Sequence, residues 1–101
     1  MITNIDHTGL ELICRKFGID ELSLFGSAIR EDFSDSSDID ILVKFEKDHV
    51  PTLFKFEELR LELCNLFGRE VDLLTKRSIE KSRNIYRKQE ILGSYRVIYA
   101  A

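Results

Sequence analysis

Two aspartates at alternate positions open one of the apolar segments of this chain, and they limit strongly what the chain can fold into. Asp38 directly precedes residues 39–45, and Asp40 lies inside that segment. Residues two apart in an extended strand point to the same face, so both carboxylates project together, with Cα atoms roughly 7 Å apart. The alternation predicts a strand with one packed face and one face open on a site. Two carboxylates on that open face can bind a hard divalent cation.

A turn suited to binding an anion precedes these aspartates. Gly26 follows the short apolar segment 21–25, which we predict to be a strand, and Ser27 opens about one helical turn over residues 27–31. A residue without a Cβ lets the backbone approach a ligand closely, and the first N–H groups of a helix are free to bind an anion. The order of strand, turn, short helix and strand therefore predicts a phosphate site beside the carboxylate pair.

A third aspartate interrupts another predicted strand. Asp72 lies within the apolar segment 71–74, where we expect it to be buried. A buried ionised carboxylate is costly unless it is paired or bound to a metal, so its presence requires a partner. A cation shared with the other aspartates is one such partner, provided that the two strands are neighbours. The alternative is a structural salt bridge to Arg69, Lys76 or Arg30.

The rest of the chain predicts one small domain of alternating elements. Outside the segments above, apolar spacing predicts helices over residues 5–17, 52–67 and 78–92 and a strand over residues 95–99. Gly18 and Gly68 lie where left-handed helix caps are expected, and Ser78 is the predicted cap of the last helix. We therefore predict a single α/β (α+β) domain over residues 1–101, with a small mixed sheet flanked by helices.

The charges divide the chain into two different surfaces. Residues 1–74 carry 16 acidic and 8 basic side chains, net −8, whereas residues 75–101 carry 2 and 7, net +5. The basic side chains of the second part are Lys76, Arg77, Lys81, Arg83, Arg87, Lys88 and Arg96. They could face nucleotide phosphates, nucleic acid or an acidic protein, or form an ordinary solvated helix face.

The cysteines, the histidines, the tyrosines and the start of the chain bear on other kinds of site and on the cellular location. Cys14 and Cys64 lie fifty residues apart without metal-ligand spacing, so neither a zinc site nor a disulfide framework is expected. His7 and His49 are expected at the surface. The tyrosines are expected to pack in the interior; they are Tyr86, Tyr95 and Tyr99. The start of the chain lacks a signal-peptide pattern, and no apolar run is long enough to span a bilayer, so we expect a cytoplasmic protein.

Three aspartates beside a phosphate-binding turn suggest chemistry at phosphorus. Two metal ions about 3.5 to 4 Å apart can support an in-line displacement, one activating the attacking hydroxyl and the other neutralising the leaving pyrophosphate. Magnesium suits a site made only of oxygen ligands. Gly26 and Ser27 would then hold the triphosphate through backbone N–H and hydroxyl groups.

The combined pattern resembles a known superfamily. Gly26-Ser27, the run Ser-Asp-Ile-Asp-Ile-Leu-Val that holds Asp38 and Asp40, and then Asp72 are similar to the motifs of DNA polymerase beta-like nucleotidyltransferases. The small size resembles the minimal nucleotidyltransferases that act as antitoxins in HEPN/MNT toxin–antitoxin pairs. That resemblance implies a nucleotidyltransferase palm that transfers AMP from ATP, with Mg²⁺, to a tyrosine of a HEPN-family toxin and silences its RNase activity. A membrane or direct nucleic-acid partner is not expected.

The resemblance also implies roles for individual residues. Gly26 and Ser27 would bind phosphates, and Arg30 matches the basic position of the motif. Asp38 and Asp40 would bind both metal ions, while Asp72 would bind the catalytic metal and help to deprotonate the acceptor. The chain has Ile29-Arg30-Glu31 where the family often has Ala-Arg-Gly, and the added acid is expected to weaken nucleotide binding. Two alternatives are a binding-only antitoxin with an idle site and a nucleotidyltransferase for a small molecule or an RNA end.

Overall fold

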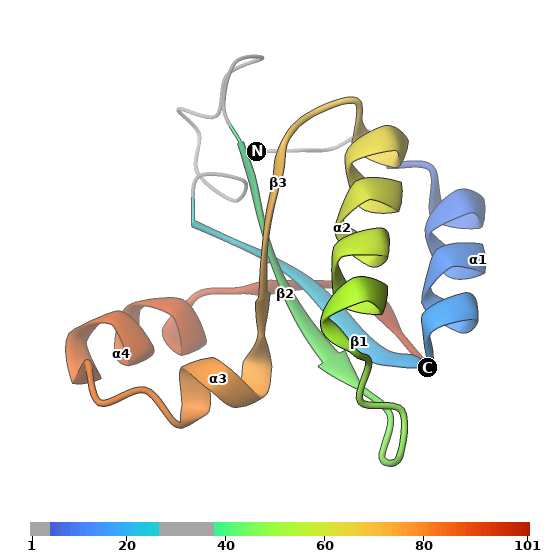
Figure 1. The fold of residues 1–101 in the computed structure, drawn as a ribbon. Coiled ribbons are helices and arrows are strands. Elements are labelled where there is room, and N and C mark those ends of the chain that lie inside the picture. Colours follow the sequence, from blue (N-terminus) through green and yellow to red (C-terminus); the bar gives the residue numbers. More distant parts are fainter. Residues whose placement is uncertain (1–4, 27–37) are drawn as a thin grey trace.

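Eight elements of secondary structure make up the computed structural model, which describes residues 5–26 and 38–101 (Figure 1). In chain order they are α1 (His7–Phe17), β1 (Ile19–Phe25), β2 (Ile39–Phe45), α2 (Leu53–Phe67), β3 (Val71–Thr75), α3 (Lys76–Glu80), α4 (Ile85–Gly93) and β4 (Arg96–Ala100). Strands and helices alternate along much of the chain, which confirms the predicted α+β class.

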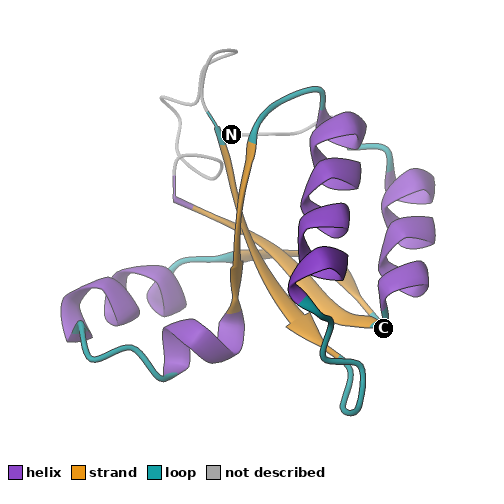
Figure 2. Ribbon diagram, viewed as in Figure 1, coloured by secondary structure: helices purple, strands orange, loops and turns teal. Residues whose placement is uncertain are grey.

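The strands form one mixed sheet in the order β3-β2-β1-β4. β1 runs antiparallel to both β2 and β4, whereas β2 and β3 are parallel. The two long helices α1 and α2 lie together on one side of the sheet, and the short helices α3 and α4 lie on the other (Figure 2). None of the helices in the described part of the chain has the length and apolar character needed to cross a bilayer.

The side-chain alternation of β2 divides the interior into two clusters. Ile39, Ile41 and Val43 are fully buried and pack in the larger cluster with α1, α2 and the other strands. Leu42 points the other way, into a smaller cluster with Ile79 of α3 and residues of α4. Burying one such aliphatic side chain stabilises the fold by about 1.5–3 kcal/mol. The second face of β2, predicted to be open, is therefore covered in part by α3 and α4.

Local side-chain caps fix the ends of the long helices. The Asp6 carboxylate accepts a hydrogen bond from the Gly9 N–H (3.0 Å) at the start of α1, and the Thr52 hydroxyl accepts one from the Lys55 N–H (3.2 Å) at the start of α2. Gly18 and Gly68 end these helices with φ of 65° and 66°. These left-handed conformations confirm both predicted caps. Glycine adopts them at little steric cost because it has no Cβ atom.

The single helix predicted over residues 78–92 is wrong, because the chain forms two helices there. Thr75 rather than Ser78 caps α3, and its hydroxyl accepts from the Ser78 N–H (3.1 Å). The Ser82 hydroxyl then accepts from the Asn84 N–H (3.2 Å), and the Asn84 side chain caps α4 by accepting from the Arg87 N–H (3.1 Å). Short polar side chains here bond to the backbone and divide the helix.

Some apolar side chains expected in the interior are exposed. Leu53 and Phe54 belong to the apolar spacing that predicts the helix over residues 52–67, yet they are 88% and 89% exposed. At 100° per residue, Phe54 lies more than a third of a turn from the direction of the buried Leu59 and Leu63, and Leu53 lies at the edge of the stripe. Tyr86 is 82% exposed, so its predicted packing role is also wrong.

Candidate active site

Two of the predicted aspartates face each other across neighbouring strands. In the parallel ladder between β2 and β3, Asp40 is the register partner of Asp72. Adjacent strands lie about 4.8 Å apart, so the two Cα atoms are close neighbours. Ile41 and Leu73, the next residues of each strand, point into the core. The aspartates therefore share one face of the sheet, as the sequence pattern predicted, although α3 and α4 partly cover that face.

Gly26 completes this arrangement at the end of β1. Its neighbour Phe25 is the register partner of Asp40, and Gly26 itself has φ of 59°. A Cβ atom at this position would collide with the Asp40 Oδ2 atom and lie 3.2 Å from its Cγ atom. The absence of a side chain at Gly26 therefore gives the Asp40 carboxylate its space, a role that the sequence pattern did not predict.

The paired carboxylates line a pocket of about 370 Å³. The sheet contributes Phe25, Gly26, Asp40 and Asp72, and the α4 segment contributes Arg87, Glu90, Ile91 and Ser94. Of the four residues from the α4 segment, only Arg87 was considered from the sequence, as one basic residue that could face phosphates. Glu90 was missed, although the spacing of Arg87, Glu90, Ile91 and Ser94 places them on one helical face. The pocket therefore combines three carboxylates, those of Asp40, Asp72 and Glu90, with the Arg87 cation.

Asp72 lies in a different environment from the one predicted. Its side chain is exposed rather than buried, because it points away from the core-facing Val71 and Leu73. It forms no ion pair with a described residue, so a structural salt bridge to Lys76 is excluded. The Lys76 ammonium instead bonds the Tyr95 hydroxyl (3.2 Å) and the Glu21 carboxylate (3.3 Å), which together raise the Lys76 pKa.

Of the remaining predicted site residues, only Asp38 is described by the structure, and it does not line this pocket. Asp38 is exposed directly before β2. Ser27, Arg30 and the short helix predicted over residues 27–31 fall outside the described residues. Within residues 5–26 and 38–101, no three His, Cys, Asp or Glu side chains converge closely enough to hold a metal ion. The three-aspartate metal site thus stays a prediction, which the oxygen donors of Asp40 and Asp72 suit.

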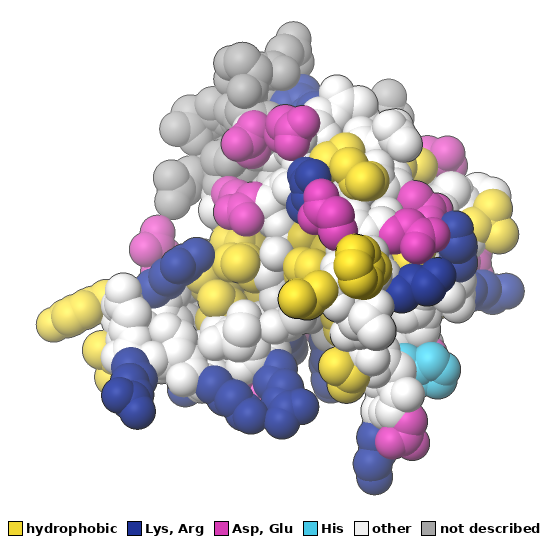
Figure 3. Space-filling model, viewed as in Figure 1, with side chains coloured by type: hydrophobic (Ala, Val, Ile, Leu, Met, Phe, Trp, Pro, Cys, Tyr) yellow, Lys and Arg dark blue, Asp and Glu magenta, His cyan; other side chains and the backbone are white. Residues whose placement is uncertain are grey.

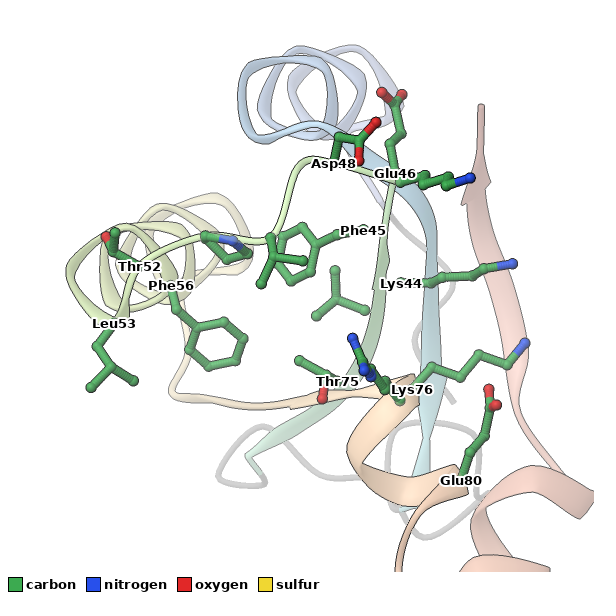
Figure 4. A pocket seen from close by; sticks show the side chains of 15 residues that line it. Lys44, Phe45, Glu46, Asp48, Thr52, Leu53, Phe56, Thr75, Lys76 and Glu80 are labelled. Carbon is green, nitrogen blue, oxygen red and sulfur yellow. The ribbon is translucent and has the colours of Figure 1, made fainter.

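A larger groove lies at the other end of β2 and β3, and it is chemically different. It encloses about 630 Å³ between α2 and α3. Leu53 and Phe56 of α2 stand on one side of it and Thr75 and Lys76 on another (Figure 4). Among the predicted site residues that the structure describes, none lines this groove. The smaller pocket, with its facing carboxylates, is therefore the candidate active site.

A mixed four-stranded sheet with paired strand carboxylates beside a glycine turn is typical of palm-type nucleotidyl-transfer domains. The chain belongs to the nucleotidyltransferase domain family, whose model matches residues 8–98. It is 45% identical over 65 residues to protein adenylyltransferase MntA of Thermococcus cleftensis, and this match spans 64% of each protein.

Solved structures share the fold. A crystal structure of a toxin–antitoxin complex with AMP-PNP matches with a TM-score of 0.70 and 18% identity, over 96% of this chain and 75% of that one. A second structure contains a tri-AMPylated Shewanella oneidensis HEPN toxin in complex with an MNT antitoxin. One chain of that complex matches with a TM-score of 0.61 and 20% identity, over 94% of this chain and 70% of that one. At these identities the likeness establishes the shared fold.

Proposed function

We propose that this chain is the antitoxin of a toxin–antitoxin pair and transfers AMP from ATP to a tyrosine of a cognate HEPN-family RNase toxin, which neutralises the toxin. The observation that carries the proposal is the Asp40–Asp72 pair beside Gly26, in a chain of the nucleotidyltransferase family. The adenylyltransferase relative and the folds of toxin–antitoxin structures support the choice of a protein acceptor.

The side chains of the pocket suit nucleotidyl transfer. Asp40 and Asp72, with Asp38 as the third predicted ligand, would hold two magnesium ions. When bound, these ions neutralise phosphate charge and favour ionisation of the acceptor hydroxyl. Gly26 lets the backbone approach the triphosphate, and Ser27 would bind it through its backbone N–H and hydroxyl groups. Arg30, at the basic position of the motif, is the other predicted nucleotide-binding residue. The Arg87 cation on the α4 wall of the pocket attracts the phosphates.

The proposed step exchanges one bond at the α-phosphorus for another. The tyrosine oxygen of the acceptor bonds to the α-phosphorus of ATP as the bridge to the β-phosphate breaks, and pyrophosphate leaves. Asp72 accepts the phenolic proton and passes it to water, which its exposed position in the pocket permits. An acceptor carried by another protein can approach the pocket for the same reason.

Intact mass spectrometry of the partner tests this proposal. The partner to use is the product of the gene adjacent to that of this chain, which the proposal expects to be a HEPN-family protein, incubated with the chain, ATP and Mg²⁺. We expect a gain of one or more AMP units with the wild-type chain and none with the Asp38→Asn/Asp40→Asn variant. A stable complex without any mass gain would instead support a binding-only antitoxin.

Magnesium and ATP are expected to raise the melting temperature of the free chain. A ligand at one hundred times its dissociation constant stabilises a protein by about 2.7 kcal/mol, which corresponds to a rise of roughly ten degrees or more in a domain of this size. In Asp40→Asn the rise should largely disappear, whereas the metal-free variant should melt slightly higher, because two facing like charges destabilise a strand pair. Thermal scans with and without Mg²⁺ and ATP check this. If neither Mg²⁺ nor ATP changes the melting temperature of the wild-type chain, the proposed metal site is contradicted.

A further inference from the structure

Most cations near α1 and α2 are neutralised within the molecule. Ion pairs join Arg15 to Glu11 (2.6 Å), Lys16 to Glu62 (2.7 Å), Lys44 to Asp20 (3.5 Å), Lys55 to Glu58 (3.4 Å) and Arg60 to Glu57 (2.6 Å). The acidic part of the chain therefore uses its own carboxylates to balance its cations, and few positive charges there are left for a partner.

The segment that holds α3 and α4 is different. Arg77, Lys81, Arg83 and Lys88 form no ion pair with any residue that the structure describes, and all but Lys88 are largely exposed. Lys and Arg side chains gather over these two helices, whereas acidic side chains dominate the region above them (Figure 3). We call these four residues the cationic surface. Their charge is available to an acidic partner.

Apolar side chains accompany this charge. Ile85 is 57% exposed and Tyr86 is 82% exposed, both on α4. A hollow of about 440 Å³ on the same helix is lined by Ile85, Lys88, Gln89, Leu92 and Gly93. Exposed tyrosine and aliphatic side chains beside cations are typical of protein interfaces, in which aromatic anchors fill apolar pockets. The net charge of −8 on residues 1–74 opposes a long polyanion such as nucleic acid.

The same helix forms one wall of the candidate active site. Arg87, Glu90 and Ile91 of α4 line the pocket that holds Asp40 and Asp72. A nine-residue helix is about 13.5 Å long, so no point on its outer side is far from the pocket. A protein that docks on the outer side of α4 would therefore place a neighbouring segment at the mouth of the pocket.

We propose that the cationic surface, together with Ile85 and Tyr86, is where the acceptor protein docks, and that the acceptor presents a face that is acidic at its rim and apolar at its centre. The inference rests on the proposed function, because the docked protein is the one that receives AMP. Charge attraction would speed the encounter, and the apolar contacts would hold the complex.

Charge reversal on this surface tests the proposal. The test variant is Arg83→Glu/Lys88→Glu, neither of which lines the catalytic pocket. The matched control is Lys47→Glu/Lys55→Glu, which changes the net charge equally on exposed residues near the start of α2. Affinity for the expected HEPN-family partner is measured with each chain at low and high salt. We expect the test variant to lose at least about tenfold in affinity at low salt and less at high salt, and the control to lose less than about threefold.

Each remaining outcome has a definite meaning. The Mg²⁺- and ATP-dependent rise in melting temperature should survive in both double variants, which shows an intact pocket. Equal affinity of test variant and wild type, or an equal loss in the control, overturns the docking surface while wild-type AMP transfer still supports the proposed function. Binding of a single-stranded RNA oligonucleotide is measured in the same way. If the test variant loses affinity for this RNA but keeps its affinity for the partner protein, the docking surface is overturned in favour of a nucleic-acid surface. A wild-type chain that neither binds nor modifies the HEPN-family protein overturns both proposals.

Discussion

Asp40→Asn is expected to lower the rate of AMP transfer by at least about a hundredfold, which corresponds to about 2.7 kcal/mol of transition-state stabilisation. The exchange keeps the size of the side chain but removes its charge, opposite Asp72 and against Gly26. An amide oxygen is a weaker ligand for a hard cation than a carboxylate is. The initial rate of mass gain of the toxin measures the effect.

Asp48→Asn is the matched control for this substitution. It makes the same chemical change in an exposed loop outside the catalytic pocket, at a residue whose φ of 73° asparagine tolerates well. The control should transfer AMP at close to the wild-type rate. Similar rates for Asp40→Asn and Asp48→Asn would show that the Asp40 carboxylate takes no part in the reaction.

Gly26→Ala is expected to reduce transfer by a comparable factor for a different reason. The new methyl group would occupy the space of the Asp40 carboxylate, which must move away from its position opposite Asp72. The φ of 59° adds backbone strain of roughly 1–2 kcal/mol for alanine. The transfer rate and the free energy of unfolding, from denaturant titration, are measured together.

Gly68→Ala separates the two effects. Gly68 has a similar φ of 66°, but nothing lies within 4 Å of the position that its Cβ would take. It should therefore lose stability through backbone strain and keep its activity. If Gly26→Ala also remains fully active, the contact between Gly26 and Asp40 is not needed for the reaction.

Local sequence patterns were enough to predict the carboxylate pair and most of the helices and strands, with the division between α3 and α4 as the exception. Alternation in residues 39–45 and 71–74 predicted two strands with their aspartates on one face, and these strands are neighbours in register. Gly18 and Gly68 predicted the two helix ends. These features depend on side-chain period and on the conformations open to glycine, both of which are local properties that a sequence displays directly.

The side chains that surround the pair depend on how distant segments pack together. Arg87 and Glu90 line the pocket because α4 packs back against the sheet. The spacing of apolar residues along a helix does not predict which other element the helix packs against. Asp72 is exposed for a related reason, since α3 and α4 cover only part of its face. Burial depends on which distant segments meet, whereas periodicity depends on neighbours along the chain. The sequence thus predicted the carboxylates, and packing supplied the cation, the pocket and the exposed surface of α4.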